Sequence, residues 1–318
     1  MKTIKTIFTK SKKVPILFFL FTLLSMKSNA QFDQMFTQYM NNEMFINPAY
    51  TGTRESFAAT LAYRNQWVGF EGAPKTQTFS MHTPVGENWG AGLSMLNEKI
   101  GITRQLRISG NYAYQIKLNR KEKLSFGIHG GIVNLKENFN ELVLRDQNDL
   151  IFPNSAANVY APNAGFGIYY YSKRYFIGFS IPRMIKNTIY GDQNINVKNS
   201  TSPKNWHFYL TAAYVKNVNA DFKFKPSIMI KEVYGAPIQA EISLQGIVKD
   251  FWWIGLAYRT GDALSAITGF HISPQLRVFY SYDYSLSSLN SYNSGSHEIT
   301  IGYDFVHKKA KIVSPRLF

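Results

Sequence analysis

Apolar and polar side chains alternate along most of this chain, from residue 56 to residue 306. In the segment 106–118, Leu106 and Tyr112 belong to the apolar set, and Arg107 belongs to the intervening polar set. Neighbouring side chains of a β-strand point to opposite faces, so this alternation gives each strand one apolar and one polar face. The pattern predicts an all-β protein.

The alternating region divides into about fourteen segments, several of them ten residues long or more. A tilted strand needs about 9–11 residues to cross a membrane, whereas strands of soluble proteins have about 5–6. This length favours a sheet that spans a membrane. The predicted strands lie near residues 56–65, 75–84, 88–98, 104–117, 122–136, 163–171, 174–182, 205–216, 221–232, 236–248, 251–260, 263–272, 275–286 and 296–306.

The connections between these segments differ in length in a regular way. Every second connection is a turn of two to four residues, such as 249–250 and 273–274, and the other set contains all the long connections, including 138–162 and 183–204. An even number of antiparallel strands with short turns at one end and longer loops at the other is typical of outer-membrane barrels. We therefore predict a transmembrane antiparallel outer-membrane β-barrel of about fourteen strands over residues 56–306.

The residues before the barrel, 31–55, follow a different pattern. Phe36 and Tyr39 belong to an apolar set with helical spacing, and Asn47 and Pro48 end that pattern. A segment of this kind covers a soluble core, lies on a membrane face or fills the lumen of a barrel. We expect a plug or a periplasmic segment.

Residues 1–30 have the features of a secretory signal peptide. A lysine-rich start precedes an apolar run at 14–24, which is too short to span a bilayer as a helix. Small residues at positions 28 and 30 predict cleavage before Gln31. The mature protein then leaves the cytoplasm, so we expect no nucleic-acid partner. No later segment is apolar enough to predict a transmembrane helix.

The composition narrows the classes of protein further. The chain of 318 residues contains no cysteine, so we expect no disulfide, thiolate metal site or lipoprotein anchor. Its formal net charge of +15 favours anionic outer-membrane lipid and lipopolysaccharide as partners. Aromatic residues make up 15% of the chain, and those near strand ends predict a girdle at the membrane interface. They are Trp252, Trp253, Tyr258, Tyr169, Tyr170, Tyr171, Tyr175 and Phe176.

The connection between the first two predicted strands carries an aromatic tip. Glycine and proline set the turn, and Trp67, Phe70 and Pro74 lie within it. Since it belongs to the set of longer loops, the tip is expected on the extracellular side. Its side chains either bind a partner at the cell surface or fold back and seal the mouth of the barrel.

Several charged residues fall on the polar face of the predicted strands, the face that lines the lumen of a membrane barrel. A lumen with charges of both signs either guides solutes or forms a salt-bridged interior against the segment 31–55. Because that segment resembles a plug, we expect a closed interior. The candidate lumen charges are Arg64, Arg107, Glu241, Arg277, Asp283 and Asp304.

The polar residues form no recognisable catalytic or metal-binding motif. The six histidines make no i, i+4 pair, and no nucleophile elbow or phosphate-binding loop is present. Ser125 with His129, and Ser265 with His271, come nearest to a hydrolase pair, but a lumen is expected to be polar without catalysis. The oxygen ligands at 146–149 lack the glycine and glutamate of an EF-hand loop. We predict no enzymatic activity, no metal and no cofactor.

Residues 307–318 form a short basic tail beyond the last predicted strand. This tail and the mature amino terminus are both on the side of the short turns, so both termini are expected in the periplasm. The lysines and arginine of the tail either meet anionic headgroups or remain solvated.

Several short blocks of the sequence are specific enough to identify a family. The most specific are YRNQW at 63–67 and GAPKTQ at 72–77. The other blocks, in chain order, are QYM at 38–40, NPAYTG at 47–52, NEKIG at 97–101 and SPR at 314–316. Together they closely resemble the PorP/SprF family of outer-membrane proteins of Bacteroidetes, over essentially the whole chain.

This resemblance implies a part in type IX secretion. One branch of the family is needed for secretion itself and works with the periplasmic and outer-membrane secretion core. The other branch is paired with a large cell-surface adhesin used in gliding motility, which it exports or anchors. The family is also linked to peptidoglycan-binding periplasmic proteins and has no enzymatic activity. The alternative function is an outer-membrane transport barrel for hydrophobic or small solutes.

Overall fold

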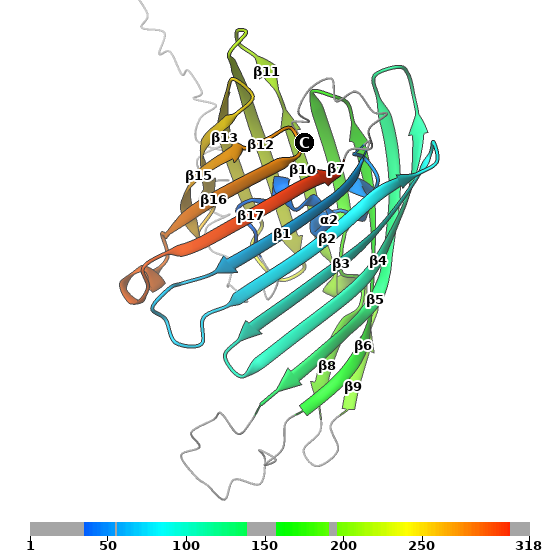
Figure 1. The fold of residues 1–318 in the computed structure, drawn as a ribbon. Helices are drawn as coiled ribbons and strands as arrows, with labels where there is room; N and C mark the ends of the chain where they lie inside the picture. The colour runs from blue at the N-terminus through cyan, green and yellow to red at the C-terminus, as the bar shows by residue number, and fades with distance from the viewer. Residues whose placement is uncertain (1–34, 55, 139–156, 191–195, 306–318) are drawn as a thin grey trace, which may run out of the picture.

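The computed structural model of the chain describes residues 35–54, 56–138, 157–190 and 196–305. Most of them belong to one antiparallel sheet that closes on itself (Figure 1). The strands of this sheet are β1 (Phe57–Asn65), β2 (Lys75–Val85), β3 (Trp89–Ile100), β4 (Thr103–Lys117), β5 (Lys123–Glu137), β6 (Ala157–Tyr171), β7 (Tyr175–Ile181), β10 (His207–Tyr214), β11 (Lys216–Asn217), β12 (Phe222–Val233), β13 (Gln239–Val248), β14 (Trp252–Arg259), β15 (Ala263–His271), β16 (Leu276–Ser285) and β17 (Ser296–Phe305).

The pairing of first and last strands closes the barrel. β1 pairs with β17 in a register that sets Arg64 opposite Glu298. On the far side, β10 pairs with both β7 and β12, and the two-residue β11 continues β10 along β12. The barrel therefore has fourteen strands when β10 and β11 are counted together, which confirms the predicted fold class.

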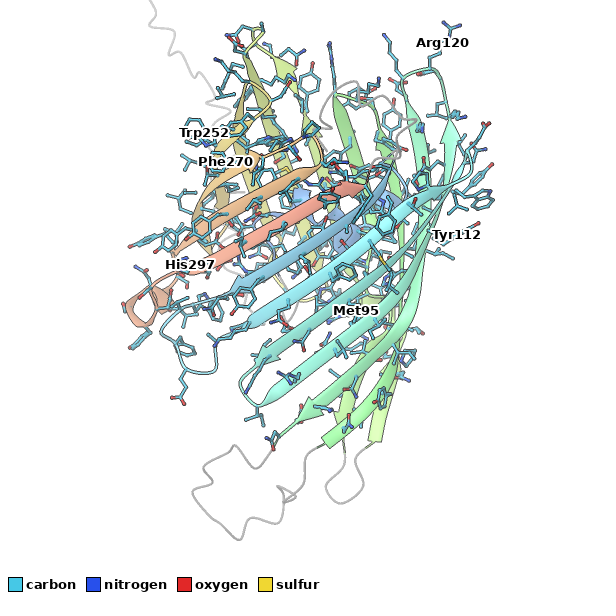
Figure 2. All side chains as sticks on the ribbon, viewed as in Figure 1. Met95, Tyr112, Arg120, Trp252, Phe270 and His297 are labelled. Atoms are coloured by element: carbon cyan, nitrogen blue, oxygen red, sulfur yellow. The ribbon has the colours of Figure 1, made fainter. Side chains whose placement is uncertain are left out.

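The barrel is apolar outside and polar inside. On β1, Thr60 and Arg64 are buried, whereas Leu61 and Tyr63, which lie between them, are exposed. The same alternation along the other strands produces a belt of large exposed apolar side chains. Tyr112 and Trp252 point away from the barrel in this way (Figure 2). Such an inverted surface is stable only where lipid replaces water around it, since water would leave this apolar area unburied.

The two ends of the barrel differ. The turn end carries the short connections, among them the tight turn at Lys249 and Asp250, whose positive φ angles of 51° and 55° suit a two-residue hairpin. The loop end carries the longer connections, including the segment 66–74 between β1 and β2. The wall is also uneven at the loop end, because β6 has 15 residues and its neighbour β7 has only 7.

Two predicted boundaries were wrong on this side of the barrel. β6 begins at Ala157 rather than near residue 163, so part of the predicted long connection is strand. The predicted loop 183–204 contains a separate hairpin of β8 (Lys186–Tyr190) and β9 (Asn196–Ser200), and then the turn η4 (Pro203–Asn205). This hairpin is a sheet of its own, and its strands are too short for a reliable alternating pattern.

The plug segment, residues 35–54, lies inside the barrel (Figure 1). It contains three short helical turns, η1 (Tyr39–Asn41), α2 (Glu43–Ile46) and η2 (Pro48–Tyr50). The helical turns therefore come later than the spacing from Phe36 to Tyr39 predicts. No helix in the described part of the chain is long and apolar enough to cross a membrane.

Candidate functional site

The amino-terminal half of the plug segment packs into an apolar cluster within the polar lumen. Phe36, Tyr39 and Ile46 from the plug meet Leu96 of β3 and Tyr209 of β10. Tyr39 is completely buried and Leu96 is 1% exposed. These large side chains bridge opposite walls, so the plug fills the width of the lumen rather than lining one side of it.

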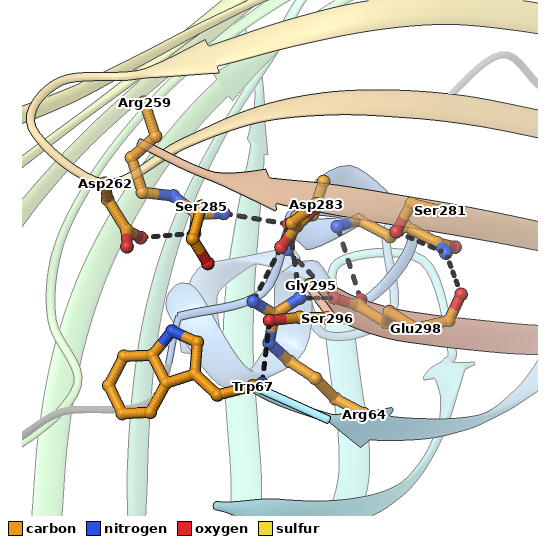
Figure 3. A network of polar contacts seen from close by, with 12 residues as sticks. Arg64, Trp67, Arg259, Asp262, Ser281, Asp283, Ser285, Gly295, Ser296 and Glu298 are labelled. Carbon is orange, nitrogen blue, oxygen red and sulfur yellow. Dashed lines mark hydrogen bonds and ion pairs between the residues drawn. The ribbon is translucent and has the colours of Figure 1, made fainter. Parts of the chain in front are cut away.

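A charged network fixes the start of the plug near the loop end (Figure 3). Arg64 of β1 lies 2.7 Å from Asp283 of β16 and 3.0 Å from Glu298 of β17. The backbone N–H of Thr37 donates to Glu298 at 2.9 Å, and the Thr37 hydroxyl donates to Asp283. All three charged side chains are buried, so each depends on the others for compensation of its charge.

Arg259 extends this network along the next strands. Its guanidinium contacts Glu241 at 2.7 Å and Asp262 at 2.8 Å, and it donates to the Thr37 hydroxyl at 2.9 Å. Figure 3 shows Arg259, Asp283 and Arg64 converging on the same part of the lumen. Five strands (β1, β13, β14, β16 and β17) and the plug therefore share one set of ionic contacts.

A second ionic group holds the other end of the plug near the turn end. Arg54, which follows the last helical turn of the plug, contacts Asp304 of β17 at 2.9 Å. Arg277 of β16 contacts the same Asp304 oxygen at 2.8 Å. Arg54 also donates to the Tyr50 hydroxyl at 3.0 Å. The plug is thus fastened at both ends by charges on β16 and β17.

Between the two ionic groups, wall side chains bond the backbone of the plug. The Ser180 hydroxyl donates to the Ile46 carbonyl at 2.6 Å, and the Ser125 hydroxyl donates to the Ala49 carbonyl at 2.7 Å. In the opposite sense, the Asn47 amide donates to the Ile168 carbonyl of β6 at 2.9 Å. The two serine bonds satisfy plug carbonyl groups that the short helical turns leave open.

Close approach of the plug to the wall depends on glycine. A Cβ at Gly127 would lie 2.2 Å from the Ala49 nitrogen, and a Cβ at Gly90 would lie 2.3 Å from the Thr51 carbonyl oxygen. Gly167, which pairs with Gly127 across β5 and β6, leaves room for the Asn47 side chain. These wall glycines allow the plug backbone to lie directly on the sheet.

The plug also carries one buried carboxyl group. Glu43 of α2 accepts a hydrogen bond from the Tyr169 hydroxyl at 2.7 Å. Burial raises the pKa of Glu43 from its ordinary value of 4.5 to about 7, although the Tyr169 hydrogen bond and the charge of Lys225 lower it. Lys225 lies over the ring of Trp253 at 5.2 Å, which also stabilises a buried ammonium group.

The aromatic tip of the first hairpin lies against the loop between β16 and β17. Val68 donates to the Gly295 carbonyl at 2.8 Å and accepts from Ser294 at 2.7 Å, and Trp67 donates to the Ser296 hydroxyl (Figure 3). Phe70 is 43% exposed. Pro74 accepts from Gln66 within the same turn, and the backbone contacts join the first hairpin to the last.

The structure brings most of the candidate lumen charges into these two ionic groups. Arg107 is apart from them and lines a cavity with Arg183 and Phe36. Sequence reasoning missed Arg259 and Glu298, although both stand on the lumen-facing side of their strands and alternation alone would have found them. It also missed the plug charges Glu43 and Arg54, for which no sequence signal exists because their partners are distant in sequence.

The predicted aromatic girdle was partly wrong. Trp252 and Tyr258 face outward, but Trp253, Tyr169 and Phe176 are buried in the lumen. Adjacent strand residues point to opposite faces, so Trp252 and Trp253 cannot both reach the lipid. Tyr169 and Phe176 instead stack on one another at 5.0 Å beneath the plug.

The residue pairs considered for hydrolysis have separate contacts. Ser125 bonds the plug backbone, and His129 contacts the Pro182 carbonyl at 2.8 Å. His271 stacks on Trp253 at 5.3 Å. In the described ranges, no group of three or more metal-ligating side chains is arranged to hold a metal ion. The considered oxygen ligands at 146–149 lie outside the described residues, as do the signal peptide and the basic tail.

The sequence profile described as type IX secretion system membrane protein PorP/SprF matches residues 28–303. The chain belongs to this family. It is therefore an outer-membrane component of type IX secretion, and its family and fold are those of a secretion component rather than of a known enzyme.

Solved structures with a similar fold are distant in sequence. A Pseudomonas aeruginosa FadL homologue is 12% identical with a TM-score of 0.46, over 82% of this chain and 93% of that chain. The Ralstonia pickettii toluene transporter TbuX is 10% identical with a TM-score of 0.48, over 83% and 93%. The P. putida toluene transporter TodX is 10% identical with a TM-score of 0.47, over 84% and 94%. No curated protein sequence matches the chain significantly.

Proposed function

We propose that this barrel is a docking component of type IX secretion, which helps to export or anchor a secreted surface protein such as a gliding adhesin. It acts by binding and does not conduct solutes. The observation that carries the proposal is the plug segment, which is fastened inside the lumen by buried ionic contacts at Arg64 and at Arg54. A barrel filled in this way binds partners on its surfaces and does not pass solutes through its lumen.

The cavities that remain beside the plug support this proposal. One is a small cavity between the plug, β3, β4, β10 and the residues that follow β7. Another small cavity lies at the turn end beside Arg54 and Arg277. The two cavities share no lining residue among the described residues, and each borders a different end of the plug.

The two ends of the barrel suit different partners. In outer-membrane barrels the longer loops face outward and the short turns face the periplasm. We therefore assign the exported protein to the loop end, where the tip at Trp67 and Phe70 lies. We assign the turn end to periplasmic partners, namely a peptidoglycan-binding protein or the secretion core. The outer surface contacts lipid and lipopolysaccharide.

Affinity purification from the native outer membrane tests this function. The tagged full-length barrel is extracted in mild detergent, and an unrelated tagged outer-membrane barrel from the same cells serves as the control. We expect a large exported surface protein with the tagged barrel and not with the control. A barrel that purifies without any exported protein would overturn the docking function.

A further inference from the structure

The loop-end half of β6 has one unpaired edge. β6 pairs with β5 along all 15 of its residues, but its other edge pairs with β7 only from Phe166 to Tyr171. β7 ends at Ile181, so residues 157–165 of β6 extend beyond it. A free strand edge presents backbone N–H and C=O groups that can pair with another chain.

The hydrogen bonds of β6 identify which residues face this edge. The Ala164 carbonyl accepts from the Met184 backbone N–H at 2.9 Å, and the Pro162 carbonyl accepts from the side-chain amide of Asn187 at 3.1 Å. Residues two positions apart face the same side, so Tyr160 and Asn158 also direct their backbone groups there. Among the described residues, the edge-facing N–H and C=O groups of Tyr160 and Asn158 have no partner.

This edge lies beyond the apolar belt of the barrel. On β5 the outward side chains change from Ile128 and Ile132 to Asn134 and Lys136 towards the loop end. Tyr160, which pairs with Asn134, is 69% exposed. The outward side chains of this part of β6 are therefore in water, and the hairpin of β8 and β9 lies against the strand without pairing with it.

The charges around the β6 edge indicate what kind of segment would bind there. Lys136 of β5 pairs with Asn158, and the hairpin that lies against β6 carries Lys186 and Lys198. All three lysine side chains are exposed. An acidic extended segment would find opposite charge here, whereas a second copy of this barrel would bring a similar set of lysines against them.

We propose that the β6 edge at Asn158 and Tyr160 binds an extended acidic segment of the exported protein by strand addition. This inference rests on the proposed docking function and names its mode of binding. Backbone hydrogen bonds from Asn158 and Tyr160 supply affinity, and alternate side chains of the added strand meet the Tyr160 ring and the lysines.

Proline substitution tests strand addition directly. Asn158→Pro combined with Tyr160→Pro removes two N–H donors that the β5 ladder does not use, and Pro162 already occupies the same side of β6. Asn158→Ala combined with Tyr160→Ala is the matched control, since it removes both side chains and keeps both donors. The probe is the exported protein that co-purifies with the wild-type barrel.

We expect the proline pair to retain about tenfold less of this protein than the alanine pair, as the loss of two exposed backbone hydrogen bonds would give. Equal retention by the two pairs would overturn strand addition while leaving the docking function intact. Absence of the exported protein from the wild-type barrel would instead contradict docking itself. A wild-type dimer that the proline pair makes monomeric would assign the edge to a second copy and overturn the proposal.

Hydrogen exchange of the wild-type barrel provides a measurement that needs no variant. In the free full-length barrel, the amides of Asn158 and Tyr160 are expected to exchange rapidly, because they have no partner within the described residues. Addition of the co-purified exported protein should slow exchange of a peptide covering residues 157–164 by two amides. Unchanged exchange in the complex would overturn the proposal.

Discussion

The backbone N–H of Thr37 lies 2.9 Å from the Glu298 carboxylate, to which Arg64 also donates at 3.0 Å. Thr37 belongs to the plug, Arg64 to the first strand and Glu298 to the last. One carboxylate therefore joins the plug to the seam where the barrel closes. Filling of the lumen and closure of the wall are stabilised by the same buried contacts.

Removal of Arg64 should destabilise both the seam and the plug. Arg64→Ala leaves Asp283 and Glu298 buried, with one cation fewer between them. Loss of one partner of a buried ionic group costs about 3–5 kcal/mol. We expect the purified barrel in detergent to unfold at a lower urea midpoint. Unfolding is measured as the loss of heat-resistant migration on a gel.

The exposed ion pair of Lys117 with Glu87 at the turn end is the control for this change. Both side chains are largely in solvent, so the pair contributes little. Lys117→Ala should leave the unfolding midpoint unchanged. Equal effects of Arg64→Ala and Lys117→Ala would contradict a role for the buried network.

A methyl group at Gly127 should displace the plug. The added Cβ would lie within 2.2 Å of the Ala49 nitrogen, so the plug backbone must move. Gly130, on the same strand, has no atom within 4 Å of an added Cβ and gives a matched control. We expect Gly127→Ala to expose the plug to added protease and Gly130→Ala to leave it protected. Equal protection of both variants would argue against direct packing of plug on wall.

The buried carboxyl of Glu43 should make stability depend on pH. Burial raises its pKa from 4.5 to about 7, so the folded barrel holds the protonated form more readily than the unfolded chain. The resulting stabilisation is complete below about pH 4.5 and is lost as the pH rises through about 7. Glu43→Gln is neutral throughout. The urea midpoint of the wild type, relative to that of Glu43→Gln, should fall as the pH rises through that window and stay level above it. A difference between the two midpoints that does not change with pH would refute the raised pKa of Glu43.

Contacts at the first hairpin should stabilise the mouth of the barrel. Val68→Pro removes the N–H that donates to Gly295, a bond worth about 0.5–1.5 kcal/mol. We expect faster hydrogen exchange in the loop from 286 to 295. Phe70→Ala, which removes only an exposed side chain, should insert and exchange normally while retaining less exported protein. Normal retention by Phe70→Ala would assign the tip to sealing alone.

The alternation of side chains was sufficient to predict the barrel and the polar lining of its lumen. Period two is set by backbone geometry, so Arg64, Asp283 and Asp304 could be assigned to the lumen without a structure. The same rule, applied strictly, would have placed Trp253 inside and Arg259 in the network. Part of the candidate site was therefore present in the pattern.

The contacts of the plug could not be read from the sequence. Glu43 meets Tyr169, and Arg54 meets Asp304, across long stretches of intervening chain. Such pairs depend on the closed barrel and leave no local pattern. The extent of β6 was also missed, because Pro162 within it is typical of a loop, and the predicted strand began only after it.

Planar-bilayer conductance tests the central claim, that this family member is a barrel closed by its own plug. The full-length barrel should insert without a steady current. A variant lacking residues 35–54, verified by gel migration as a folded barrel, should conduct as an open pore. A stable open pore from the full-length barrel would contradict the account and favour transport of small solutes.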